Sequence, residues 1–135
     1  MVTALYVGLY SIIFFVLSYM VVRKRRELKI AIGSNGNENL ERLISAHSNF
    51  MQYSIFMIML LFFAEMEEIL NPTTVHLFGV IFLVGRLLHF FSLAKFEPAK
   101  TEINNKFIFR VIAMQITFFC LIALAVLLII NWILS

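Results

Sequence analysis

The chain has 135 residues, of which 61% are hydrophobic and 14% are charged, and its mean hydropathy is +0.92. A soluble domain of this size could not hide so much apolar surface, so soluble enzyme folds and nucleic-acid-binding domains are excluded. The net charge of +3 is small, and the placement of the charges is more informative than their sum. The composition predicts an integral membrane protein.

Four apolar segments are long enough to cross a bilayer, which takes about 20 mostly apolar residues in a helix. We expect an all-α, up-down bundle of four transmembrane helices in a single domain, 1–135. The helices are expected at about 2–26, 40–67, 74–95 and 105–134.

The first segment lacks the layout of a signal peptide. No basic residue precedes its apolar run, no small-residue cleavage site follows it, and the basic cluster Arg23–Arg26 comes after it. We therefore expect this segment to remain as a membrane anchor.

The second segment opens with a polar stripe. Arg42, Ser45, Asn49 and Gln52 follow one another at spacings of three, four and three, so they share one face of a helix. An arginine at the centre of a membrane helix costs about 2.5–3.5 kcal/mol on insertion scales. The stripe should therefore face a protein interior or a water-filled cavity, which makes it a candidate site.

The third segment begins with a helix start signal at Asn71-Pro72, and the tight link before it predicts that the second and third helices are antiparallel neighbours. Its Arg86 and His89 are three residues apart, on one face. Arg86 is the deepest basic residue, and no carboxylate is expected at its depth. If Arg42, Arg86 and Arg110 converge, a buried positive charge needs an anionic ligand, which would enter from the cytoplasmic side.

Basic residues predict the orientation. The second connection and both chain ends carry no lysine or arginine. By the positive-inside rule, the first and third connections are cytoplasmic and both termini face out. The basic residues of these two connections are Arg23, Lys24, Arg25, Arg26 and Lys29 in the first, and Lys95, Lys100 and Lys106 in the third.

Each polar residue also has a structural interpretation. Arg42 and Lys106 could extend to the interface, and Asn49 and Gln52 could form hydrogen bonds between helices. His47 and His89 could suggest a metal or haem pair, but no cysteine or carboxylate joins them as a further ligand, so no metal is expected. Cys120, the single cysteine, should be a small packing residue, and an intrachain disulfide is impossible.

Three stretches of the sequence resemble the MAPEG family, the membrane-associated proteins in eicosanoid and glutathione metabolism. The stretch from VVRKRREL to SAHSNFMQY resembles the basic helix end, the Gly-rich loop and the Arg-x-x-Arg-Ala-His-x-Asn-x-x-Glu-Tyr-x-Pro signature of the family. VGRLLHFF and RVIAMQITF resemble its Gly-Arg-x-x-His and Arg-Val-x-Gly-x-x-x-Thr elements. The three elements occur in order over most of the chain, and the short form most resembles bacterial members.

The resemblance implies a homotrimer that binds glutathione between subunits near the cytoplasmic side of a bacterial inner membrane. It implies that Arg110 stabilises the glutathione thiolate, which would attack a hydrophobic small molecule or a lipid peroxide arriving through the bilayer. An adjacent guanidinium favours the thiolate of a free thiol, whose pKa is about 8.5. The glutathione-binding residues implied in this way are Arg25, Arg26, Arg42, His47, Asn49, Gln52, Tyr53, Arg86, His89 and Thr117.

Two departures from the family pattern keep other functions open. Ser45 stands where the family has a second arginine, and Gln52 stands where it has a glutamate. The leading hypothesis is a glutathione-dependent transferase or peroxidase. A non-catalytic member that binds a lipid or small anion is the alternative. A proton-coupled drug exporter is disfavoured because the first helix lacks a membrane-embedded carboxylate.

Overall fold

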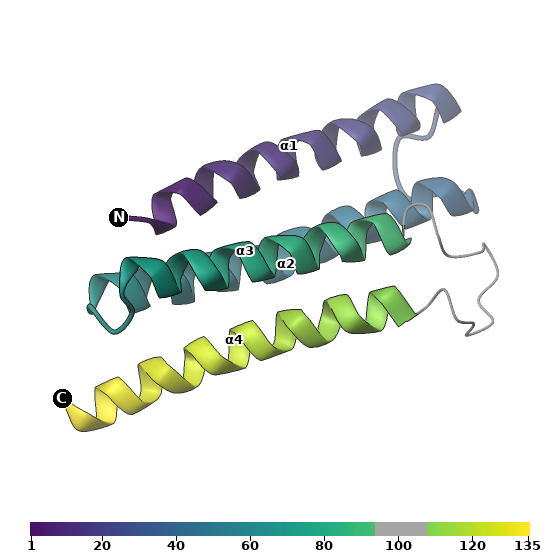
Figure 1. Cartoon of the computed structure of the whole chain (residues 1–135). Coiled ribbons are helices and arrows are strands. Elements are labelled where there is room, and N and C mark those ends of the chain that lie inside the picture. The colour runs from purple at the N-terminus through teal and green to yellow at the C-terminus, as the bar shows by residue number, and fades with distance from the viewer. Residues whose placement is uncertain (94–107) are drawn as a thin grey trace.

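The computed structural model describes residues 1–93 and 108–135. Four helices alternate in direction: α1 (Thr3–Leu28), α2 (Glu38–Met66), α3 (Pro72–Phe91) and α4 (Ile108–Leu134) (Figure 1). Each helix is long and apolar enough to span a membrane, which confirms the predicted fold class. Both chain ends share one end of the bundle with the α2–α3 connection, and we call this the terminal end. The opposite end, with the α1–α2 connection, is the loop end.

The basic cluster after the first apolar run belongs to α1. The helix continues to Leu28, two residues past the expected boundary. Arg23 and Lys24 pair with Glu27 at 3.0 and 3.2 Å, and pairs at these spacings support a helix. Lys29 then ends the helix in a left-handed conformation, with φ of 57°. The helix therefore extends beyond the apolar segment that predicted it.

Asparagine side chains begin the next two helices. Asn37 accepts a hydrogen bond from the Leu40 amide at 3.0 Å, so α2 begins at Glu38 rather than at residue 40. Asn71 accepts from the Thr74 amide at 2.9 Å, and Pro72 occupies the first turn of α3. The start signal expected at Asn71-Pro72 is confirmed.

The predicted ends around the third connection lie partly outside the described residues. The described part of α3 ends at Phe91 and that of α4 begins at Ile108. The expected boundaries at residues 95 and 105 fall in the range 94–107, as do Lys95, Lys100 and Lys106. The lysines assigned to the third connection therefore lie outside the described residues, and their location rests on the sequence alone.

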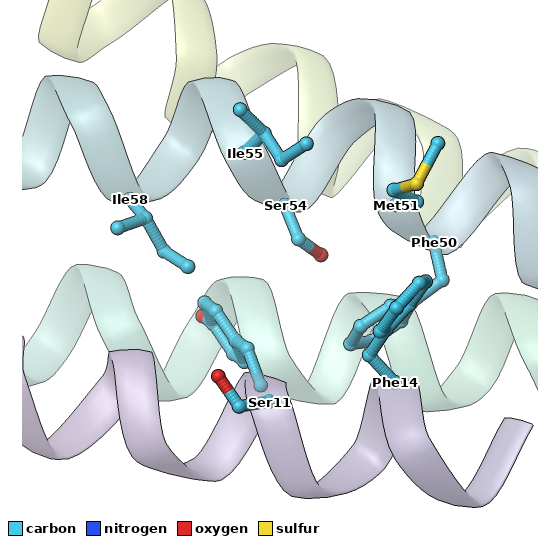
Figure 2. A pocket seen from close by; sticks show the side chains of 8 residues that line it. Ser11, Phe14, Phe50, Met51, Ser54, Ile55 and Ile58 are labelled. Carbon is cyan, nitrogen blue, oxygen red and sulfur yellow. The ribbon is translucent and has the colours of Figure 1, made fainter. Parts of the chain in front are cut away.

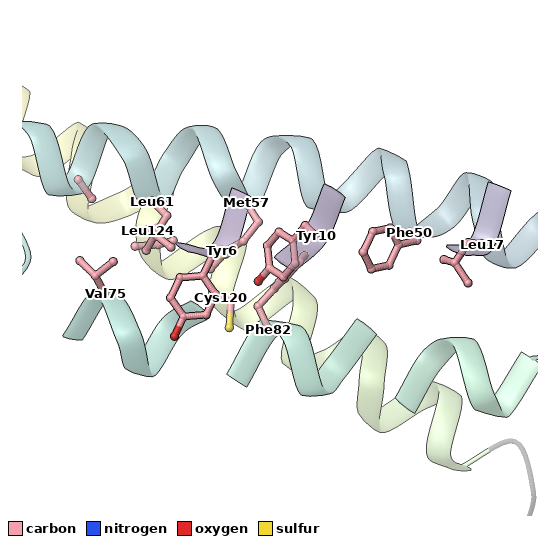
Figure 3. Close-up of a cluster of buried hydrophobic side chains, with 11 residues drawn as sticks. Tyr6, Tyr10, Leu17, Phe50, Met57, Leu61, Val75, Phe82, Cys120 and Leu124 are labelled. Carbon is pink, nitrogen blue, oxygen red and sulfur yellow. The ribbon is translucent and has the colours of Figure 1, made fainter. Parts of the chain in front are cut away.

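The helices α2 and α3 form the centre of the bundle. Each contacts both other helices, while α1 and α4 lie on opposite sides of this pair (Figure 1). The antiparallel α2–α3 pairing expected from the tight link is confirmed. The shared core contains Tyr10, Phe82 and Leu124, and it encloses Cys120 at 1% exposure (Figure 3). The cysteine is a buried packing residue, as its apolar neighbours indicated.

A glycine lets α1 approach α3 closely at the terminal end. A Cβ atom on Gly79 would lie 2.3 Å from the ring of Tyr6, which is far inside contact distance. The Tyr6 hydroxyl donates to the carbonyl of His76 at 3.0 Å, and the Tyr10 hydroxyl donates to the carbonyl of Gly79 at 3.0 Å. Both tyrosines therefore join α1 to the α3 backbone.

The end of α2 completes the start of α1. The carboxylate of Glu65 accepts hydrogen bonds from the backbone amides of Val2 and Thr3, the second at 2.8 Å. The first amides of a helix lack partners within the helix, and they carry partial positive charge that a carboxylate stabilises. Glu65 thus caps α1 from a neighbouring helix.

Candidate functional site

Arg86 lies at the centre of a polar cluster between α2, α3 and α4. Its side chain is 1% exposed. Its guanidinium donates to the Asn49 Oδ1 atom at 2.7 Å, to the Met114 sulfur at 3.6 Å and to the Thr117 hydroxyl. Three helices therefore converge on one buried cation.

Aromatic rings form the walls of this cluster. The Arg86 guanidinium carbon lies 5.2 Å from the ring centroid of Tyr53 and 5.6 Å from that of Phe82. A cation at this distance is attracted to the negative face of a ring. The rings stabilise the charge without neutralising it.

Close packing of α4 on α3 sets the geometry. A Cβ atom on Gly85 would lie 3.0 Å from the Ile116 side chain, so the absence of a side chain at Gly85 lets α4 pack closely on α3 beside Arg86. The Thr117 hydroxyl donates to the Ala113 carbonyl at 2.9 Å, one turn earlier in α4. That bond leaves the oxygen lone pairs facing the guanidinium, so Thr117 is fixed as an acceptor.

The positive charge of Arg86 has no anionic partner among the residues described. Its acceptors are an amide, a hydroxyl and a thioether, all neutral, and its Nε atom has no hydrogen-bond partner. The ion pairs found within residues 1–93 and 108–135 join Arg23 and Lys24 to Glu27, at the loop end. Glu97 and Glu102 lie outside the described residues, so the expectation that no carboxylate meets Arg86 stays a prediction for the whole chain. An unpaired charge in a low-dielectric interior is costly, so an anionic partner would stabilise the cluster.

His89 and Arg110 extend the cluster toward the loop end. His89 is 3% exposed, its Nε2 atom has no partner, and it lies within electrostatic reach of both Arg86 and Arg110. Arg110 is half-buried and precedes Thr117 by seven residues, so both lie on one face of α4. Arg42 is half-buried near the start of α2. The predicted set Asn49, Tyr53, Arg86, His89 and Thr117 is thus brought together, with Arg110 beside it.

His47 lies in a different contact. Its Nε2 atom is 2.9 Å from the Ser18 hydroxyl, and its ring stacks on Phe14 with centroids 4.8 Å apart. Both partners belong to α1, on the side of α2 away from α4. The structure does not bring His47 to Arg86, and it joins α1 to α2 instead.

The polar stripe of α2 is divided between two environments. Asn49 is partly buried and bound to Arg86, whereas Ser45 and Gln52 are exposed in the single chain. Ser45 and Gln52 therefore do not face the interior of the single subunit, and a water-filled cavity or a neighbouring subunit as their surroundings stays a prediction. Spacings of three and four residues spread across about 100° of a helix surface, wide enough to reach both the interior and its edge.

Arg25 and Arg26 lie at the loop end, apart from Arg86. Arg25 donates to the carbonyls of Gly33 and Ala31 at 2.8 and 3.3 Å, which folds the α1–α2 connection back onto the helix. Arg26 is exposed. With Lys29 they line a cavity of about 340 Å³ at this end. Arg25 thus has a structural role in the chain, and a glutathione carboxylate contact by either arginine stays a prediction.

Sequence reasoning missed two residues that shape the cluster, and it gave Gly85 only as part of the Gly-Arg-x-x-His element, without its packing role. Met114 supplies a sulfur acceptor, Phe82 supplies one aromatic wall, and Gly85 sets the approach of α4. Phe82 precedes Arg86 by one helical turn and Met114 precedes Thr117 by three residues, so helical spacing could have indicated both. The requirement for Gly85 depends on which residue of α4 faces it, which spacing does not provide.

Comparison with known proteins is consistent with this architecture. The family model described as "MAPEG family" matches residues 3–130. The inner membrane protein YecN of Escherichia coli strain K12 is 35% identical over 92 residues, which cover 68% of this chain and 70% of YecN. YecN of E. coli O6:H1 strain CFT073 gives the same identity and coverage. No solved structure matches significantly. With four membrane-spanning helices and a family match over nearly its whole length, the chain belongs to the MAPEG family.

Proposed function

We propose that this protein is a glutathione-dependent enzyme of the transferase or peroxidase type in a bacterial inner membrane. The observation that carries the proposal is Arg86, a buried cation whose hydrogen-bond acceptors in the described chain are all neutral. A thiolate or carboxylate of glutathione would supply the missing negative charge. Membership of the MAPEG family and similarity to an inner membrane protein support the ligand and the location.

In this proposal, Arg110 stabilises the glutathione thiolate. A cationic environment lowers the pKa of a thiol and increases the fraction of the nucleophilic form. Arg86 and His89 would add positive potential from the deeper side, and Asn49 would hold Arg86 in place. The thiolate would attack an apolar electrophile or a lipid peroxide that diffuses in from the bilayer. An apolar second substrate suits a site at membrane depth.

Exposed polar residues support assembly as a homotrimer. Ser45 and Gln52 on α2 and Gln115 on α4 are exposed in the single chain, yet they lie in membrane-spanning helices. Polar side chains in a bilayer are rarely left against lipid, and they are stabilised when another helix covers them. Neighbouring subunits would cover these residues and close the site, with Gln52, Arg25 or Arg26 reaching a ligand there. The basic first connection would face the cytoplasm, with both termini outside.

A titration with glutathione tests the proposal. We expect saturable formation of thiolate, followed by its ultraviolet absorbance, in the purified protein in detergent. Arg110→Ala should abolish thiolate formation while leaving the size of the particle unchanged. Arg23→Ala is the matched control, because Arg23 is exposed and paired with Glu27. Absence of binding at millimolar glutathione, in a protein with an intact assembly, would contradict the proposal.

A non-catalytic binding role is the second candidate. Asn49 and Thr117, implied as glutathione contacts, already use their acceptor oxygens on Arg86. That arrangement also fits a small anion or a lipid headgroup bound directly by the guanidinium. Binding of inorganic phosphate or an anionic lipid, with no thiolate formed from glutathione, would favour this role.

A further inference from the structure

Two cavities of this bundle differ in the chemistry of their walls. The cavity of about 230 Å³ between α1 and α2 is lined by apolar side chains and hydroxyls (Figure 2). The cavity of about 340 Å³ at the loop end combines basic residues with an apolar wall, and we call it the loop-end cavity. Its lining residues are Val22, Arg25, Arg26, Lys29, Ile30 and Ala31. Walls of both kinds fit a ligand that is anionic at one end and apolar at the other.

A reversal of the chain at the end of α1 builds the loop-end cavity. Lys29 adopts a left-handed conformation, and the Ile30 amide donates to the Arg25 carbonyl at 3.0 Å. The Arg25 Nη1 atom donates in turn to the carbonyls of Ala31 and Gly33 at 3.3 and 2.8 Å. These bonds hold the α1–α2 connection against the last turn of α1, so apolar residues of the connection lie beside basic residues of the helix.

The three basic residues of the loop-end cavity have no carboxylate partner among the residues described. The ion pairs found within residues 1–93 and 108–135 use Arg23 and Lys24, which share Glu27. Arg25 bonds to neutral carbonyl oxygens, and the other two basic residues of the cavity are exposed. The cavity therefore gathers positive charge that an anionic group would neutralise.

The depth of the loop-end cavity matches the headgroup region of a bilayer. The part of α1 that precedes it, from Thr3 to Val22, contains no charged residue. At the rise of an α-helix this part spans about 30 Å, which is the thickness of the hydrocarbon core. Val22 then lies where the acyl chains end, and the basic side chains lie about one turn farther along, at the level of the lipid phosphates.

The α1–α2 connection also exposes an apolar side chain beside the cavity. Ile32 follows the residues that form the apolar wall, and it is 89% exposed. An apolar side chain at a membrane surface is stabilised when it enters the acyl-chain region. The loop end thus offers a lipid both a charge contact and apolar contacts, whereas a free phosphate ion would use the charge contact only.

We propose that the loop-end cavity binds one anionic phospholipid, whose phosphate pairs with the three basic side chains. The glycerol and the first methylene groups pack against the apolar wall. Basic residues close to a membrane surface attract anionic lipids in this way. The site is separate from the proposed catalysis, because neither Arg86 nor Arg110 lines the cavity. It gives Arg25 and Arg26 an anionic partner other than glutathione.

A lipid titration followed by native mass spectrometry tests this site in the full-length protein in detergent. The probes are dioleoyl phosphatidylglycerol and dioleoyl phosphatidylcholine, which have the same acyl chains but differ in net headgroup charge. We expect one saturable phosphatidylglycerol site per chain, with an affinity at least about tenfold above that for phosphatidylcholine. Millimolar inorganic phosphate should not displace the lipid, because it lacks the apolar contacts. Millimolar glutathione should not displace it either.

Two double variants with equal net charge assign the preference to the cavity. Arg26→Gln combined with Lys29→Gln removes two cations from the cavity and should lower the affinity for phosphatidylglycerol about thirtyfold, the loss expected for two basic residues at a membrane surface. Arg23→Gln combined with Lys24→Gln removes the same charge from the pairs with Glu27, and the affinity should stay within about threefold of the wild type. None of the four substituted residues is buried, so both variants should keep the helical content and particle size of the wild type.

Several outcomes would overturn the proposal. Equal affinity for the two lipids would mean that the headgroup charge is not recognised. Equal losses in the two double variants would place recognition in the net charge of α1 rather than in the cavity. Displacement by inorganic phosphate would make a free phosphate ion the ligand, and displacement by glutathione would assign Arg25 and Arg26 to the proposed glutathione site instead.

Discussion

Two polar clusters in this bundle share α2 and α3 but are completed differently, the first with α1 and the second with α4. At the terminal end, the hydroxyls of Tyr6 and Tyr10 and the carboxylate of Glu65 each bond to backbone groups of another helix. Around Arg86, the guanidinium meets neutral acceptors and keeps an unpaired Nε atom. The first cluster joins helices through hydrogen bonds to backbone groups, whereas the second holds a buried cation that has only neutral acceptors among the described residues.

The largest expected effect comes from closing the space at the terminal cluster. Gly79→Val should lower the free energy of unfolding by about 3 kcal/mol, because the added carbon atoms collide with a Tyr6 ring held on both sides. Gly8→Val is the control, since a Cβ atom there meets nothing within 4 Å. Denaturation in detergent micelles measures the free energy of unfolding of both variants. Similar losses in the two variants would show that the Tyr6–Gly79 contact has no special importance.

At Arg86 we expect a substitution to change the free energy of unfolding little and to lower glutathione affinity strongly. Arg86→Met should change the free energy of unfolding by less than about 1 kcal/mol, because the lost hydrogen bonds are offset by removal of a buried charge. Glutathione affinity should fall at least about tenfold, the worth of a charged hydrogen bond. Calorimetry and denaturation on the same samples separate the two effects, with Arg23→Met as control. A large loss in the free energy of unfolding with unchanged glutathione affinity would mean that Arg86 joins helices, as Tyr6, Tyr10 and Glu65 do, and does not bind the ligand.

The smallest expected effect concerns the charge of Glu65. The Val2 and Thr3 amides bond to different oxygens of the Glu65 carboxylate, so Glu65→Gln keeps an acceptor for only one of them and also removes the negative charge at the start of α1. We expect a loss of about 1 kcal/mol, from one hydrogen bond and the charge near the helix N-terminus. Hydrogen exchange at the first amides of α1 should accelerate, while the exposed Glu67→Gln variant should match the wild type. Unchanged hydrogen exchange in Glu65→Gln would mean that the remaining side-chain oxygen caps α1 without help from the negative charge.

The fold follows from the sequence because its signals are local. Apolar runs long enough to cross a bilayer predict four helices, and Asn71-Pro72 predicts where α3 begins. The helix ends at Leu28 and Glu38 differ by about two residues from expectation. There, side-chain pairing with Glu27 and capping by Asn37 extend the helices beyond their apolar parts.

The candidate site follows from the sequence only in part. Spacing within one helix correctly grouped Arg86 with His89, and the family pattern added Asn49 and Thr117. Whether a side chain points to the interior depends on helix rotation, which spacing alone does not fix. For that reason His47 turns toward α1 and Gln52 turns outward, although both share a motif with Asn49. The need for Gly79 and Gly85 arises from contacts between helices far apart in the chain.

The cap that Glu65 places on α1 has a consequence for how the protein is made. The carboxylate that receives the Thr3 amide is synthesised 62 residues after it, at the far end of the second helix. The Glu65 carboxylate can therefore reach the Val2 and Thr3 amides only after α2 has crossed the bilayer in the return direction. The cap on α1 is thus a product of the α1–α2 hairpin and not of either helix alone.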